Sequence, residues 1–161
     1  MRCLIVYYSM SGNCKMVAEK VAKELGADTL RIEPVKAYPD KGMRKFLWGG
    51  KSAVMGEMPK LNPYEVDINK YDQVVFGFPV WAGNVTPPIR TFVNEQAEFL
   101  KKCKIAAFAC QSGSGGEKAL DKLKELVGIN ELTADMILID PMTKESTAND
   151  EKIKSFCEAI K

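Results

Sequence analysis

The chain has 161 residues, of which 46% are hydrophobic and 27% charged, with a formal net charge of +2 and no histidine. These values are typical of a globular protein, and no run of residues approaches the roughly 20 apolar residues of a membrane span. The missing histidine excludes a histidine general base and a histidine-ligated metal. The weak charge, with lysines that mostly alternate with acids, argues against nucleic-acid binding.

The cysteines and the N-terminus indicate the cellular setting. The five cysteines include no close pair of the CxxC kind, which favours reduced and mostly buried thiols over disulfides or a metal cluster. The apolar run at the N-terminus is short and has no small-residue cleavage site. We therefore expect a cytoplasmic protein with a single domain over residues 1–161.

A strand, a polar turn and a helix open the chain. Residues 3–7 are apolar and partly β-branched, which predicts a buried parallel strand. Beyond the turn, Val17, Val21 and Leu25 recur at helical spacing, and Gly26 marks the end of the helix. A helix start presents unpaired N–H groups and the positive end of the helix dipole, and both suit a phosphate.

The turn itself carries groups that could bind such a ligand. Ser9, Ser11 and Asn13 offer side-chain donors, and Gly12 allows the backbone to approach a ligand closely. Lys15 is the only basic residue next to this turn, and its place in the pattern is compatible with exposure to solvent. Ser11 and Asn13 could equally cap the helix, so the turn alone favours neither capping nor ligand binding.

After a predicted edge strand at 29–33, the segment 34–70 is broken repeatedly by proline and glycine. The stretches 43–48 and 52–55 within it predict one or two short helical pieces. A connection of this length is usually functional or disordered. Its aromatic residues indicate a covering insert that packs onto the body of the protein; they are Tyr38, Phe46, Trp48 and Tyr64. This insert could either form part of a binding pocket or close it, and the sequence favours neither.

Strands and helices alternate through the rest of the chain. Thr86 followed by two prolines is typical of an N-cap with proline at the first helical position, and that helix is expected to continue to about 99–100. Asn149 is expected to cap the last helix. Strands are predicted at 73–78, 104–109 and 134–139, with helices beginning near 87, 117 and 149. This alternation predicts a parallel sheet with helices on both faces and right-handed crossovers.

In such a sheet, the loops at 9–14, 79–86 and 110–116 emerge at one edge, at the carboxyl ends of the strands. The first offers a phosphate site, and the third is a polar, glycine-rich strip that is expected to need a partner to become rigid. Trp81 lies between small residues and has little core to join, so we expect it to stack on a flat ring. The three loops together predict a ligand with a phosphate at one end and an aromatic system at the other.

These loops resemble those of the flavodoxin family. Ser9-Met10-Ser11-Gly12-Asn13-Cys14 resembles the family's phosphate loop, hydroxyl-x-Thr-Gly-x-Thr, with Cys14 as a weaker donor in place of threonine. The stretch 77–84 with Pro87 and Pro88 resembles the flavin-stacking loop of compact flavodoxin-like proteins, and Cys110 through Gly116 lies where the third flavin loop is found. The resemblance covers nearly the whole chain.

The resemblance implies a doubly wound five-stranded parallel sheet of order 2-1-3-4-5, with helices on both faces and FMN bound non-covalently at the switch point. The residues that it implies for the cofactor site are Ser9, Met10, Ser11, Gly12, Asn13, Cys14, Pro79, Val80, Trp81, Ala82, Gly83, Asn84, Cys110, Gln111, Ser112 and Gly113.

The leading functional hypothesis is a redox protein that passes electrons through FMN to a redox partner protein or a small electron acceptor, as a monomer or a dimer. An NAD(P)H-dependent FMN oxidoreductase of the quinone reductase type is the alternative. A phosphorylatable receiver domain is excluded because its acidic residues are missing after strands one and three, and a dinucleotide-binding site is excluded because Gly12 stands alone.

Two expectations concern the tuning of the flavin. No Asp or Glu occurs in 9–14, 79–88 or 110–116, which predicts a less negative potential for the second reduction step than in an acid-lined site. A peptide that turns over on reduction needs the conformational freedom of glycine, and Gly83 is the candidate.

Overall fold

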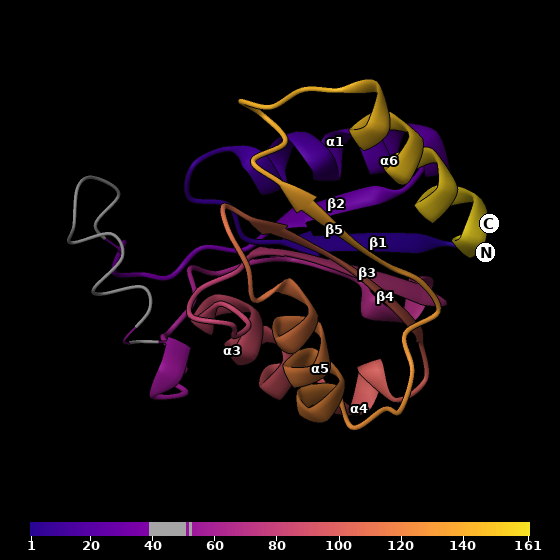
Figure 1. Ribbon diagram of the computed structural model, residues 1–161. Coiled ribbons are helices and arrows are strands. Elements are labelled where there is room, and N and C mark those ends of the chain that lie inside the picture. The colour runs from indigo at the N-terminus through magenta and orange to yellow at the C-terminus, as the bar shows by residue number, and fades with distance from the viewer. Residues whose placement is uncertain (39–50, 52) are drawn as a thin grey trace.

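A five-stranded parallel sheet lies at the centre of the computed structural model, which describes residues 1–38, 51 and 53–161 (Figure 1). The strand order is β2-β1-β3-β4-β5, so the fold predicted from the sequence is confirmed. The strands are β1 (Cys3–Tyr7), β2 (Asp28–Arg31), β3 (Gln73–Pro79), β4 (Lys104–Gln111) and β5 (Asp135–Ile139).

Helices cover both faces of the sheet, as Figure 1 shows. Helices α1 (Asn13–Leu25) and α6 (Thr147–Ile160) pack together on one face. Helices α3 (Pro87–Glu95), α4 (Ala97–Leu100) and α5 (Gly116–Val127) lie on the other, and a short 3₁₀ turn, η1 (Ile68–Lys70), precedes β3. Among the helices that the structure describes, none combines the length and the apolar character needed to cross a bilayer.

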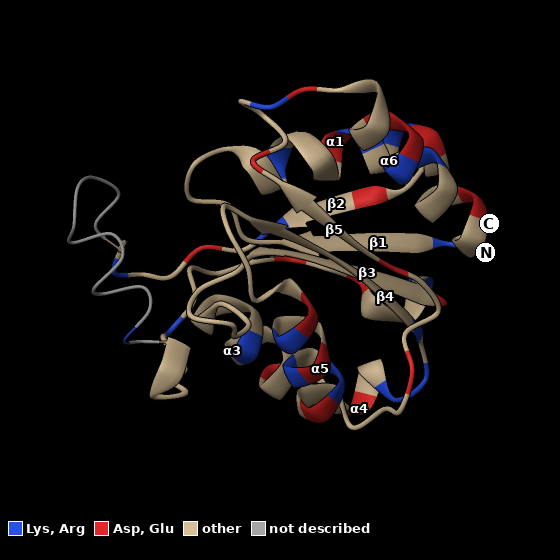
Figure 2. Cartoon of the chain, in the orientation of Figure 1, with Lys and Arg blue, Asp and Glu red and all other residues tan. Residues whose placement is uncertain are grey.

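The central strands are hydrophobic on both sides because each face is covered by helices. On β1, Leu4 and Val6 contribute to the core beneath α3 and α5, whereas Ile5 and Tyr7 contribute to the core beneath α1 and α6. Figure 2 shows the charged residues gathered on the helices and loops, while β1 and β3 carry almost none. The continuous apolar runs that predicted buried strands therefore reflect burial on two sides.

Helix boundaries differ from the expectations in two places. The helix that follows Thr86 ends at Glu95, and α4 is a separate short helix instead of its continuation. The last helix begins before Asn149, because Ser146 is its N-cap and accepts the Asn149 N–H at its Oγ over 3.1 Å. The side chain of Asn149 instead donates to the carbonyl of Lys144 over 3.0 Å.

The described parts of the predicted insert are attached to the sheet and to α3. Pro34 and Leu61 form an isolated antiparallel bridge beside β2, and Thr91 on α3 donates its hydroxyl to the carbonyl of Pro59 over 2.7 Å. Tyr64 donates its hydroxyl to Glu95 over 2.7 Å. The helix expected at 43–48, with Phe46 and Trp48, lies outside the described residues, as do positions 49, 50 and 52.

Candidate functional site

A cavity of about 250 Å³ lies at the carboxyl ends of β1, β3 and β4, where the three predicted loops meet. Most of the predicted site residues line it: Met10, Ser11, Asn13, Pro79, Val80, Trp81, Ala82, Cys110, Gln111, Ser112 and Gly113, together with Ser114. Five predicted site residues do not line this cavity: Ser9, Gly12, Cys14, Gly83 and Asn84. The parallel sheet thus brings together segments that are distant in the sequence.

The turn between β1 and α1 leaves backbone donors unused. Gly12 is the N-cap of α1 with φ of 98°, and neither Ser11 nor Asn13 caps the helix with its side chain. Ser9 Oγ instead accepts the Lys15 N–H over 3.2 Å. Among the described residues, the amide N–H groups of residues 11–14 meet no acceptor. Ser11 and Asn13 therefore do not cap the helix, and the N–H groups of residues 11–14 stay available to an acceptor.

A cation supports this turn from the neighbouring strand. Arg31 on β2 donates from Nη2 to the carbonyl of Ser9 over 3.1 Å, and its Nε lies 3.0 Å from a Glu33 carboxylate oxygen. Arg31 could not be identified from the sequence, because it is 22 positions from Ser9 and only the β1–β2 pairing brings it near. Lys15 is half-exposed and lies 3.9 Å from Glu19, as expected of a solvent-facing lysine.

The thiol of Cys14 points away from the cavity. Cys14 and Cys110 both belong to the apolar core beneath α1 and α6. Burial, and a hydrogen bond with the Cys110 thiol, raise the pKa of Cys14 well above its usual value. Cys14 can therefore serve a ligand through its backbone N–H, whereas a role for its thiol, as implied by the threonine of the family pattern, has no support in this geometry.

The second loop is a tight hairpin turn. Trp81 and Asn84 pair across it, with the Asn84 N–H donating to the Trp81 carbonyl over 3.0 Å. Ala82 and Gly83 have φ of 50° and 69°. Positive φ at both central positions is the type I′ pattern, which is unfavourable for alanine. The candidate site thus contains a residue, Ala82, in a conformation that its neighbours must maintain.

Trp81 has more core around it than the sequence analysis expected. Its side chain is only 9% exposed, and its ring makes edge-to-face contacts with Tyr8 at 5.7 Å and Tyr38 at 5.2 Å between centroids. The expectation that it has little core to join is wrong, because Tyr38 arrives from the insert. Trp81 nevertheless lines the cavity with Ser11 and Ser112, so it both packs and faces the site.

The third loop is held by its own side chains. The carboxamide of Gln111 accepts the Gly116 N–H over 2.8 Å and donates to the Gly113 carbonyl over 3.1 Å. The Cys110 carbonyl accepts the Val80 N–H over 2.9 Å, which joins this loop to the second. The strip thus has hydrogen bonds of its own, and its need for a partner to become rigid stays a prediction.

The second and third loops approach each other backbone to backbone. Gly115 has φ of 99°, and a β-carbon there would lie 3.0 Å from the Cα of Gly83. A side chain at position 115 would therefore be strained and would push the two loops apart.

We expect Gly115→Ala to lower the free energy of unfolding by about 1–2 kcal/mol, because alanine is disfavoured at positive φ and meets the Gly83 backbone. Urea unfolding followed by circular dichroism measures this. Gly113→Ala is the matched control, since a β-carbon there meets nothing within 4 Å and its φ is not positive. Equal unfolding free energies for the two variants would show that the contact between the loops does not constrain the fold.

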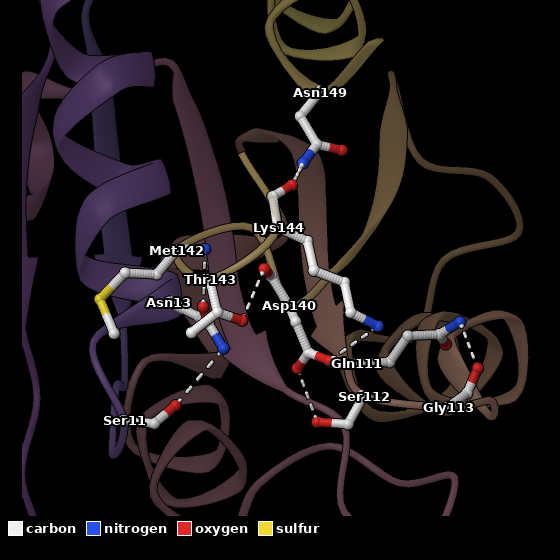
Figure 3. Close-up of polar contacts among 10 residues, drawn as sticks. All are labelled: Ser11, Asn13, Gln111, Ser112, Gly113, Asp140, Met142, Thr143, Lys144 and Asn149. Atoms are coloured by element: carbon white, nitrogen blue, oxygen red, sulfur yellow. Dashed lines mark hydrogen bonds and ion pairs between the residues drawn. The ribbon is translucent and has the colours of Figure 1, made fainter. Parts of the chain in front are cut away.

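A fourth loop, between β5 and α6, contacts the other loops (Figure 3). The Met142 N–H donates to Asn13 Oδ1 over 3.0 Å, and Ser112 donates its hydroxyl to Asp140 over 2.8 Å. This loop is not among the three predicted from the sequence, although it also emerges at the carboxyl edge of the sheet. The sequence feature that could have indicated this loop is Asp140, an acid directly after the last strand.

Comparison with known proteins decides the family. A family model described as flavodoxin matches residues 2–153. The chain belongs to the flavodoxin family. That assignment agrees with the strand order and with the position of the cavity at the carboxyl edge, which is where open parallel sheets bind their ligands.

Solved structures of flavodoxin-like proteins share the fold at low sequence identity. A flavoprotein from Lactobacillus acidophilus NCFM, solved in complex with FMN, is 21% identical with a TM-score of 0.76, over 96% of this chain and 97% of its own. A putative flavoprotein from Bacteroides eggerthii DSM 20697 is 21% identical with a TM-score of 0.73, over 99% and 97%. Oxidised flavodoxin 2 from Bacillus cereus is 16% identical with a TM-score of 0.59, over 99% and 97%.

Proposed function

We propose that the protein binds FMN non-covalently in this cavity and passes electrons through it to a redox partner protein or a small electron acceptor. The observation that carries the proposal is the row of N–H groups at residues 11–14, which meet no acceptor among the described residues. Such groups at a helix N-terminus bind phosphate well. Membership of the flavodoxin family supports FMN as the source of that phosphate, as does the FMN-bound Lactobacillus flavoprotein.

The residues of the cavity fit the two ends of this cofactor. The hydroxyl of Ser11 and the carboxamide of Asn13 lie beside the free N–H groups and can add hydrogen bonds to a phosphate. Trp81 supplies an aromatic wall for the ring system. FMN supplies the redox chemistry when bound, and the chain holds it, orients it and sets the charge around it.

FMN titration should distinguish the phosphate site from the rest of the cavity. We expect FMN to bind about 100-fold or more tightly than riboflavin, which lacks the phosphate, because charged hydrogen bonds contribute about 1.5–3 kcal/mol each. We also expect Ser11→Ala to weaken FMN binding about three- to tenfold and to leave riboflavin binding unchanged. Quenching of flavin fluorescence and titration calorimetry measure both ligands.

Two results would count against this function. Equal affinities for FMN and riboflavin would show that the first turn does not bind the phosphate. The absence of both heat and quenching on addition of FMN would show that the protein does not bind this cofactor. Anaerobic addition of NADPH or NADH to the FMN-loaded protein tests the alternative. Rapid bleaching of the flavin would favour an NAD(P)H-dependent oxidoreductase, whereas the electron-transfer proposal expects none.

A further inference from the structure

The register of the sheet places a carboxylate next to the proposed flavin cavity. Gln111 on β4 is paired with Ile139 on β5, so the residues that follow them, Ser112 and Asp140, leave the sheet side by side. The Asp140 N–H donates to the Gln111 carbonyl over 2.9 Å, which fixes the backbone of Asp140 against the third loop. Ser112, which lines the cavity, donates its hydroxyl to the Asp140 carboxylate over 2.8 Å (Figure 3).

The position of Asp140 is strongly constrained. Its φ is 40°, an unfavourable conformation for a residue other than glycine, so its surroundings must hold it there. Its carbonyl accepts the N–H groups of Thr143 and Lys144 over 3.1 and 2.8 Å. Its carboxyl side chain is only 22% exposed. The backbone of Asp140 is thus held in place, and one carboxylate oxygen, Oδ1, accepts the Ser112 hydroxyl.

The lysine that lies near this carboxylate is poorly placed to neutralise it. Lys144 Nζ lies 3.6 Å from Asp140 Oδ2, and the lysine side chain is 65% exposed. An exposed ion pair is screened by water and contributes little. The negative charge of Asp140 is therefore only partly compensated. It is separated from the cavity by Ser112, which lines the cavity and donates to the carboxylate.

We propose that Asp140 is a positioning residue of the FMN site, which holds Ser112 and disfavours the negative charge that the flavin ring acquires on reduction. The proposal rests on the proposed binding of FMN in this cavity. The absence of acids from the three predicted loops led to the expectation of a less negative potential for the second reduction step. The fourth loop places an acid beside those loops, so this expectation changes. The charge of Asp140 acts against reduced FMN more than against oxidised FMN, so it lowers the reduction potential.

The chain offers a series of charge variants on one loop. Asp140→Asn removes the charge and keeps an oxygen that can accept the Ser112 hydroxyl. Lys144→Gln removes the partially compensating cation. Glu145→Gln is the matched control, because it removes one negative charge from the same loop at an exposed residue that does not line the cavity.

The measurement is the ratio of two affinities for each variant, one for oxidised FMN in air and one for dithionite-reduced FMN without oxygen, at pH 8. Any repulsion between Asp140 and the phosphate is the same in both states and cancels in the ratio. We expect Asp140→Asn to favour reduced FMN about three- to tenfold relative to the wild type, and Lys144→Gln to shift the ratio the opposite way. Tenfold corresponds to about 30 mV in the two-electron potential.

Each outcome has a defined meaning. A ratio for Asp140→Asn equal to that of Glu145→Gln would overturn the proposal, as would a loss of affinity that is the same for both states, which indicates a structural role alone. A wild-type protein that binds neither form of FMN would overturn the proposed function itself. Binding by the wild type with an unshifted ratio in Asp140→Asn would overturn only the role of Asp140.

Discussion

Replacing Gly77 with alanine is expected to destabilise the protein by about 2–4 kcal/mol. A β-carbon at position 77 would lie 2.1 Å from Cζ of Phe108, whose ring crosses from β4 onto β3. Phe108 is fully buried, so its ring has no free space in which to move. Inserting a methyl group into a filled core commonly costs 1–3 kcal/mol and sometimes more. Thermal or urea unfolding of the purified variant measures the loss.

The double variant Gly77→Ala with Phe108→Leu provides the control. A smaller side chain at position 108 leaves room for the new methyl group, so the two losses should be clearly less than additive. Additive losses would show that the contact between Gly77 and Phe108 is not the cause. Because the Gly77 carbonyl accepts the Tyr8 N–H over 3.0 Å, displacement of β3 would also reach the turn that begins at Ser9.

The strands could be predicted because a strand that is buried on both faces has a continuous run of apolar residues. Residues 74–78 and 105–109 carry no polar or charged side chain, and the structure places both within central strands. Helix ends were harder to predict. Ser146 and Asn149 are both good N-cap residues, and the choice between them depends on the Lys144 carbonyl, which takes the Asn149 side chain. Such a contact is visible only once the loop is folded.

The location of the site could be predicted from topology, whereas its supporting contacts could not. Parallel strands direct their following loops to one edge, which is enough to bring Ser11, Trp81 and Ser112 around one cavity. Arg31 and Asp140 reach these loops across strand pairs. Their contacts depend on register, and the sequence pattern predicts which residues form strands without predicting their register.

Trp81 lies at the predicted edge of the sheet, but the side chains that surround it were not predicted. Small neighbours in the sequence suggested an indole without a core. Tyr38, from a segment with no clear pattern, packs against it, and Tyr8 completes the aromatic cluster. Burial raises the pKa of Tyr8, which fits a phenol enclosed by these rings. The indole is thus fixed in place before any ligand arrives, which favours binding because less freedom is lost.

Replacing Trp81 with alanine is therefore expected to affect both stability and cofactor binding. Removing a buried indole should lower the free energy of unfolding by about 3–5 kcal/mol. Loss of an aromatic wall should weaken FMN binding by about 1 kcal/mol or more, which is roughly five- to tenfold. Denaturant unfolding without FMN gives the first value, and fluorescence titration at a temperature where the variant is folded gives the second.

Trp81→Phe separates the two effects, because it keeps an aromatic ring against Tyr8 and Tyr38 and loses less volume. We expect it to be more stable than Trp81→Ala and to bind FMN with an affinity between those of the alanine variant and the wild type. If both variants lose stability but bind FMN as tightly as the wild type, Trp81 is a core residue that lines the cavity without contacting the ring. The aromatic wall must then come from a side chain other than Trp81.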